Sequence, residues 1–171
     1  MIIKIVKLKK MQQIVYSPIG IIHTPFRAHE DMPIQGIGGK GIKATIEIYP
    51  EFSAGLKDLD GFSHIILIYH MHLVEKPSLI VKPFLDDEKR GIFATRSPVR
   101  PNPIGLTTVR LIEIKDNRLI VEDIDMIDQT PLLDIKPCLP MIDDIQSLRL
   151  GWLTGKVELF SQKKSDDRFK G

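Results

Sequence analysis

Hydrophobic and polar residues alternate along 42–49, where isoleucine or alanine takes every second position and lysine, threonine or glutamate lies between. A period of two places successive side chains on opposite faces of an extended chain, so this pattern predicts a half-buried β-strand. The continuous apolar run 65–69 predicts a buried strand. Apolar segments at 106–114 and 119–124 flank the hairpin signal Lys-Asp-Asn-Arg at 115–118 and predict a strand pair.

The remaining patterns add little helix. Residues 51–59 are the best candidate for a short helix, and 156–160 predict a late strand. Many short strands separated by glycine and proline turns, without an internal repeat, indicate a mainly β fold of barrel or sandwich type. We expect a single domain over 14–160, preceded by a basic and apolar extension at 1–13 and followed by a polar tail at 161–171.

Composition changes this picture only slightly. With 171 residues, 43% of them hydrophobic and 27% charged, the chain resembles an ordinary soluble globular protein. A net charge of +2 is compatible with an RNA partner without arguing for one. We see neither a membrane-length apolar run nor a signal peptide. The single cysteine, Cys138, suits a reducing compartment, so we expect a cytoplasmic protein.

The stretch 94–106, Ala-Thr-Arg-Ser-Pro-Val-Arg-Pro-Asn-Pro-Ile-Gly-Leu, is the strongest functional signal. Its closely spaced prolines exclude helix and central strand and favour a stiff, extended loop. Such a loop would present Arg96, Arg100 and Asn102 in fixed directions, which suits binding of a carboxylate, a phosphate or a polar cofactor. The alternative is a connecting segment whose arginines are merely solvated.

Two other motifs are weaker. Residues 36–41 match the dinucleotide pattern G-x-G-x-x-G, but a period-two strand follows them and no strand–helix–strand unit surrounds them, so we interpret them as a flexible loop. His70 and His72 would share one face of a strand, as metal ligands can. Two histidines at one spacing are little support, and we predict no metal site.

A second proline-containing segment, 122–134, is rich in acidic residues. These are Glu122, Asp123, Asp125, Asp128 and Asp134. Aspartates are common turn residues, so this cluster can be structural. A hydrolase with paired carboxylates is conceivable, but sequence spacing cannot show two acids on either side of one bond.

Taken together, separate blocks of the sequence resemble, in order, the signatures of the TrmO (YaeB, VirR-like) family. Residues 94–106 match the family's A-T-R-S-P-x-R-P-N-P-I-G-L. The other matching blocks are 18–26, 33–36, 59–64 and 125–140, and His72 stands where a histidine follows a family strand. Five ordered blocks are far more specific than one motif.

The resemblance implies a single-sheeted β-barrel that forms homodimers. It implies an S-adenosylmethionine-dependent methyltransferase acting on threonylcarbamoyladenosine in tRNA, so the expected partner is the tRNA anticodon loop, with neither a membrane nor DNA. It also implies a cofactor site, which would comprise Pro33, Ile34, Gln35, His72, Leu73, Arg96, Leu106, Ile124 and Asp125. In this site a carboxylate such as Asp125 would accept ribose hydroxyls or the ammonium group, and Arg96 would pair with the methionine carboxylate or orient the loop.

For the acceptor, we expect Arg100, Asn102 and Lys136 to bind substrate, with Arg100 or Lys136 holding the threonyl carboxylate. Removal of a proton from the acceptor nitrogen should help methyl transfer, and Asp128 or His72 is the candidate base. The sequence does not choose between these two.

Two departures from the family pattern bear on the acceptor. Gln129 replaces a glycine, which costs about 1 kcal/mol if the position has a positive φ. Cys138 replaces a tyrosine. A methyltransferase with another acceptor and a non-catalytic β-barrel binding module therefore stay open as alternatives.

Overall fold

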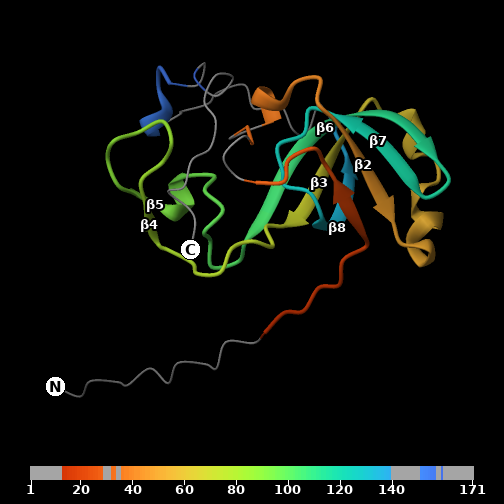
Figure 1. Cartoon of the computed structure of the whole chain (residues 1–171), viewed down its shortest axis with the longest axis horizontal. Coiled ribbons are helices and arrows are strands. Elements are labelled where there is room, and N and C mark those ends of the chain that lie inside the picture. The colour runs from red at the N-terminus through yellow and green to blue at the C-terminus, as the bar shows by residue number, and fades with distance from the viewer. Residues whose placement is uncertain (1–12, 29–31, 34–35, 140–150, 157–158, 160–171) are drawn as a thin grey trace.

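The computed structural model describes residues 13–28, 32–33, 36–139, 151–156 and 159. The expected extension at 1–13 and tail at 161–171 therefore fall almost entirely outside the described residues. Within them the chain forms a closed barrel of strands with a lobe of loops to one side (Figure 1). The predicted mainly β fold is confirmed, and it is a barrel rather than a sandwich.

The barrel strands are all antiparallel to their neighbours in the order β1-β2-β7-β6-β3-β8, closing on β1. Their bounds are β1 Gly20–His23, β2 Lys43–Ile48, β3 His64–His70, β6 Ile104–Lys115, β7 Arg118–Glu122 and β8 Thr130–Pro137. The predicted strands at 42–49, 65–69, 106–114 and 119–124 correspond to β2, β3, β6 and β7. Asp116 and Asn117 form the predicted hairpin turn, in which Lys115 pairs with Arg118.

Strand alternation fills the barrel interior. In β2 the buried positions are Ala44, Ile46 and Ile48, and the residues between them are more exposed. The apolar run in β3 follows the same rule, since Ile65 and Leu67 are fully buried while the residues between them are only partly covered. Each strand thus buries one face in the barrel, which is why the period of two was visible in the sequence.

Because neighbouring strands are antiparallel, the ends of β1, β3 and β7 meet the starts of β2, β6 and β8 at one end of the barrel. We call this end the rim. It carries the connections 24–42, 71–103 and 123–129. The opposite end carries 49–63 and the hairpin turn at 116–117.

The longest rim connection, 71–103, forms the lobe at the side of the barrel (Figure 1). It contains the short strands β4 Ile80–Val81 and β5 Arg90–Gly91 and the 3-10 helix η5 Ile92–Ala94. Val81, Ile92 and Val99 form a small core of their own there. The Met71 N–H donates to the Pro103 carbonyl at 2.8 Å, which closes the base of the lobe.

Other elements differ from expectation. The helix expected at 51–59 consists of two 3-10 helices, η3 Pro50–Leu56 and η4 Leu59–Gly61, because Asp58 between them has a φ of 64° and interrupts a continuous helix. The strand expected at 156–160 is wrong at its described positions, since Lys156 lies in a turn and Leu159 in a 3-10 turn. The 3-10 helix η6 Gly151–Leu153 precedes them.

The glycine-rich segment contains the 3-10 helix η2 Gly36–Gly39. A Cβ atom on Gly39 would lie 2.0 Å from the Ile124 carbonyl oxygen, so glycine is required there by close backbone packing. The segment therefore packs against the 123–129 connection rather than forming a dinucleotide-binding loop.

Candidate functional site

Three side chains from different segments form a hydrogen-bonded network at the rim. Thr107, inside the start of β6, donates its hydroxyl proton to Asp125 Oδ1 at 2.8 Å. The Tyr69 hydroxyl at the end of β3 lies 3.2 Å from the same threonine oxygen. Because the threonine proton is already given to Asp125, Tyr69 donates to Thr107. The network fixes a half-buried carboxylate at the rim.

Electrostatics keep this network in one protonation state. Burial, reinforced by the negative charge of Asp125, raises the pKa of Tyr69 well above its ordinary value, although the Thr107 hydrogen bond and the positive charge of Arg96 act in the opposite direction. The phenol therefore stays neutral and remains a donor. Arg96, in the 94–106 loop, is therefore one of the charged groups that act on this network.

Gly105 allows Tyr69 to occupy this position. The two residues are register partners on β6 and β3, and a Cβ atom on Gly105 would lie 2.2 Å from the tyrosine ring. The glycine that ends the proline-rich stretch is therefore a packing requirement for the ring that reaches Thr107.

Several predicted cofactor residues lie around the network. Leu106 is on the outer face of β6 and 53% exposed, beside Thr107 in sequence. His72 and Leu73 form a turn directly after β3, with the histidine partly buried and Leu73 exposed. The structure thus brings these three residues, Arg96 and Asp125 to the same barrel end.

The remaining predicted cofactor residues differ in their surroundings. Ile124 is fully buried in the barrel core, so its side chain serves packing and only its backbone borders the rim. Pro33 is buried in the connection between β1 and β2. Ile34 and Gln35 lie outside the described residues.

Arg100, a predicted substrate residue, braces its own loop. Its Nη1 donates to the carbonyl oxygens of Ile92 at 3.2 Å and Thr95 at 3.0 Å. Its guanidinium also lies 5.7 Å from the centre of the Phe93 ring. Asn102 is exposed, and its carbonyl accepts the Ile104 N–H at 2.8 Å.

Lys136 is not brought to the rim. It pairs in register with Ile66 near the start of β3 and forms an ion pair with Asp134 at 2.8 Å. Cys138 lies still nearer the opposite end, where its N–H donates to the His64 carbonyl. Both residues of the second signature therefore lie away from Tyr69 and Asp125.

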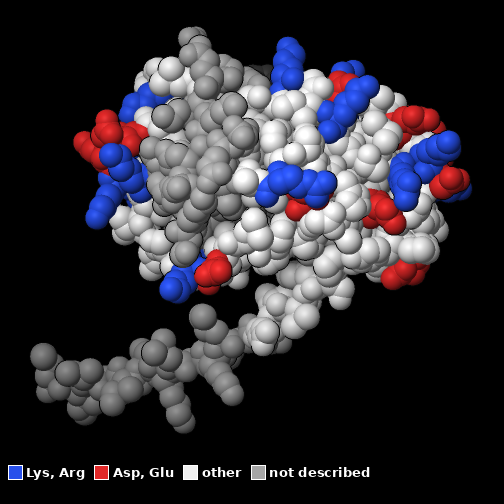
Figure 2. All heavy atoms as spheres, viewed as in Figure 1, with Lys and Arg blue, Asp and Glu red and all other residues white. Residues whose placement is uncertain are grey.

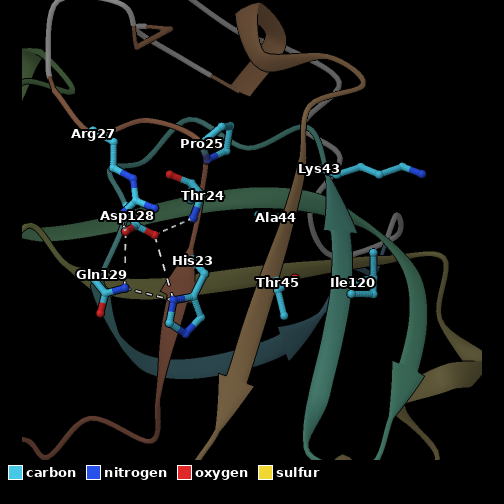
Figure 3. A pocket seen from close by; sticks show the side chains of 10 residues that line it. All are labelled: His23, Thr24, Pro25, Arg27, Lys43, Ala44, Thr45, Ile120, Asp128 and Gln129. Carbon is cyan, nitrogen blue, oxygen red and sulfur yellow. Dashed lines mark hydrogen bonds and ion pairs between the residues drawn. The ribbon is translucent and has the colours of Figure 1, made fainter.

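A pocket of about 470 Å³ lies on the β1–β2–β7 side of the rim (Figure 3). Asp128, the other candidate base, is buried there and accepts the Thr24 N–H at 2.9 Å and the Gln129 side-chain amide at 3.3 Å. It also forms an ion pair with Arg27. Burial alone would raise the pKa of Asp128, but these hydrogen bonds and the charge of Arg27 outweigh it and hold the pKa below its ordinary value.

Gln129 has a φ of 64°, the condition under which the sequence predicted a cost for replacing glycine. Its side-chain amide donates to His23 Nδ1 at 3.0 Å as well as to Asp128 (Figure 3). These two bonds offset part of the backbone strain. Gln129, which differs from the family's glycine, therefore lines this pocket.

Sequence reasoning missed Thr107, Tyr69, His23 and Arg27. Thr107 carried a usable signal, because it is a polar residue at a core-facing position of an alternating strand. Arg27 and His23 carried none, since their partners are about a hundred residues away along the chain.

Residues 21–144 match the profile of the tRNA-methyltransferase O N-terminal domain. A probable S-adenosyl-L-methionine-binding protein of Pyrococcus abyssi is 52% identical over 156 residues, covering 91% of this chain and 85% of its own length. An S-adenosyl-L-methionine-binding protein of Archaeoglobus fulgidus is 40% identical over 134 residues, covering 78% of this chain and 96% of its own.

Solved structures agree with this match. The crystal structure of TrmO from Pseudomonas aeruginosa superimposes with a TM-score of 0.70 at 33% identity. The match covers 82% of this chain but 63% of that chain, so the present sequence corresponds to less than two thirds of the solved protein. Among the described residues, no helix has the length and apolar character needed to cross a membrane.

Proposed function

The chain belongs to the family of tRNA-methyltransferase O N-terminal domains, and from this membership we propose that it is an S-adenosylmethionine-dependent tRNA methyltransferase. We further propose that it methylates the exocyclic nitrogen of threonylcarbamoyladenosine beside the anticodon, as a homodimer. The observation that carries the proposal is the Tyr69–Thr107–Asp125 network beside Arg96.

The residues at the rim fit this cofactor. S-adenosylmethionine, when bound, supplies a methyl group activated by a sulfonium, together with a ribose diol and an amino acid end. Asp125 is a carboxylate oriented by Thr107 and suits the diol or the ammonium group. Arg96 suits the carboxylate, and exposed Leu106 gives apolar surface for a base.

The chain's chemical contribution is mainly placement of donor and acceptor, which can supply roughly 7–11 kcal/mol of the barrier. Of the two candidate bases, we propose His72. Asp128 is already engaged by Thr24, Gln129 and Arg27, and its lowered pKa makes it a weak proton acceptor. His72 follows the β3 end that carries Tyr69.

For the acceptor, Arg100 is the better-placed cation for the threonyl carboxylate, because it lies on the same loop as Arg96. Lys136 is at the opposite barrel end, so it would serve an acceptor at this rim only as the partner subunit's Lys136. Contacts to the tRNA body should be made largely to phosphates and weaken with salt.

The test combines calorimetry with S-adenosylmethionine and transfer of a labelled methyl group to tRNA from cells able or unable to make threonylcarbamoyladenosine. We expect binding, and transfer only to the modified tRNA. Asp125→Asn should weaken cofactor binding by tenfold or more, about 1.4 kcal/mol. Asp116→Asn, in the exposed hairpin turn at the other barrel end, is the matched control.

The outcomes separate the alternatives. Absence of heat up to millimolar cofactor would contradict cofactor binding and favour a non-catalytic module. Equal transfer to both tRNAs would retain the methyltransferase and overturn the acceptor. Cofactor binding without transfer to either tRNA would point to another acceptor.

A further inference from the structure

Phe93 exposes its ring far more than its surroundings explain. It lies in the 3-10 helix η5, where the preceding Ile92 is fully buried in the small lobe core, yet Phe93 itself is 76% exposed. Single exposed apolar side chains are common, so exposure alone identifies no site. What distinguishes Phe93 is how its neighbours hold it.

Arg100 supports one side of the Phe93 ring. The guanidinium carbon is 5.7 Å from the ring centre, within range of a cation–π interaction. Because Arg100 also donates to the carbonyls of Ile92 and Thr95, on either side of this turn, the cation is fixed relative to the ring. The high exposure of Phe93 leaves much of the ring facing solvent.

Trp152 braces the same turn from another direction. Its Nε1 donates to the Ala94 carbonyl at 2.7 Å, one residue after Phe93. The cations of Arg90 and Lys156 lie 6.0 and 5.7 Å from the centre of the indole ring. Both cations also pair with Asp86, at 2.8 and 3.1 Å. The turn carrying Phe93 is therefore tied to the lobe at several points.

The position of Phe93 relates it to the proposed site. Phe93 lies in the rim connection 71–103, whose base is closed by the Met71–Pro103 hydrogen bond, and it is three residues before Arg96, whose positive charge acts on the Tyr69 phenol. On the face shown in Figure 2, lysine and arginine side chains lie beside acidic ones rather than forming one continuous basic surface.

We propose that Phe93, backed by Arg100, is a stacking site for a nucleobase of single-stranded RNA next to the nucleotide being methylated. This inference rests on the proposed function and adds a subsite to it. Unpaired bases stack on rigid aromatic rings whatever their sequence, and Arg100 holds the Phe93 ring in one position for such stacking. A ring fixed by its turn loses little conformational freedom on binding.

The experiment measures binding of a short single-stranded RNA and of an anticodon stem-loop by fluorescence anisotropy. Phe93→Ala should weaken both by about tenfold, and Phe93→Tyr should remain within about twofold of the wild type. Phe52→Ala is the matched control, because Phe52 is also exposed, at 41%, but lies at the opposite barrel end. Melting temperatures should be unchanged, since each ring is exposed.

Calorimetry with the cofactor and light scattering test whether Phe93 instead contacts the cofactor or a second copy of the chain. Unchanged RNA binding in Phe93→Ala overturns the proposal. So does a loss confined to S-adenosylmethionine affinity, which would assign the ring to the cofactor's adenine, or a fall in mass, which would assign it to a second copy of the chain. If the wild type binds RNA but transfers no methyl group, the proposed function fails while Phe93 stacking is still measured directly. If it binds no RNA, both fail.

Discussion

The Gln129 side-chain amide donates to His23 Nδ1 at 3.0 Å, although the two residues are 106 positions apart. This bond leaves the histidine proton on Nε2, which lies 3.9 Å from Glu47. The same amide reaches Asp128 at 3.3 Å. One strained residue therefore links the end of β1 to the connection before β8.

Substitutions of Gln129 should separate strain from hydrogen bonding. Gln129→Ala removes both side-chain bonds and keeps a backbone φ of 64°, so the free energy of unfolding should fall by about 1 kcal/mol. Gln129→Gly loses the same bonds but relieves the strain, and should be the more stable of the two variants. Urea denaturation measures both, and a less stable glycine variant would contradict the strain argument.

Thr107→Val keeps the shape of the side chain and removes its hydroxyl. Tyr69 and Asp125 would each lose a hydrogen-bond partner, so we expect a loss of roughly 1–3 kcal/mol in the free energy of unfolding. Affinity for S-adenosylmethionine should fall as well. Thr108→Val, on the exposed side of the same strand, is the control and should change neither quantity.

Stability should depend on Asp128 at acidic pH. Its folded-state pKa lies below the unfolded value of about 3.9, so its contribution is fully present above that value and is lost as pH falls through the folded pKa. Denaturation between about pH 2 and pH 7 should show a falling free energy in the wild type and a shallower fall in Asp128→Asn. Equal slopes would show that Asp128 contributes nothing to acid sensitivity.

Gly105→Ala should disrupt the rim through steric overlap. The new Cβ would lie 2.2 Å from the Tyr69 ring, and overpacking of this kind costs roughly 1–3 kcal/mol. Gly91→Ala is a matched control, because nothing lies within 4 Å of a Cβ at that position. Thermal melting compares the two, and equal melting temperatures would mean that Tyr69 can move aside without loss.

Trp152→Phe should loosen the lobe locally. An aromatic ring can still contact Arg90 and Lys156, but the hydrogen bond to the Ala94 carbonyl is lost, a change of about 1 kcal/mol. Hydrogen exchange should quicken at the Thr95 amide, which donates to Ile92 in this turn. Unchanged exchange there would show that the indole N–H does not brace the turn.

The barrel strands could be predicted because each buries one face, which produces the alternation seen at 42–49 and 106–114. The site could be predicted only in part. Thr107 resembles any threonine in a strand, and its partners become visible only when the register of β6 with β3 is known. Asp128 finds Thr24 through closure of β8 onto β1, which no local pattern records.

Lys136 shows that residues of one sequence signature can lie far apart in the fold. It lies in the same signature as Asp125 and Asp128, but β8 begins between them and carries the chain away from the rim. At about 3.3 Å per residue, the six positions from Thr130 amount to roughly 20 Å. A signature that includes a whole strand therefore contains residues from both ends of the barrel.

The way the 71–103 lobe joins the barrel determines which parts of the chain can vary in length. β3 and β6 are hydrogen-bonded neighbours, and the Met71–Pro103 bond continues their pairing beyond His70 and Ile104. The lobe thus leaves and re-enters the barrel at one point, as an insertion in a hairpin does. The length of the lobe can therefore change without altering the register of any barrel strand, so the barrel and the lobe are free to vary independently in size.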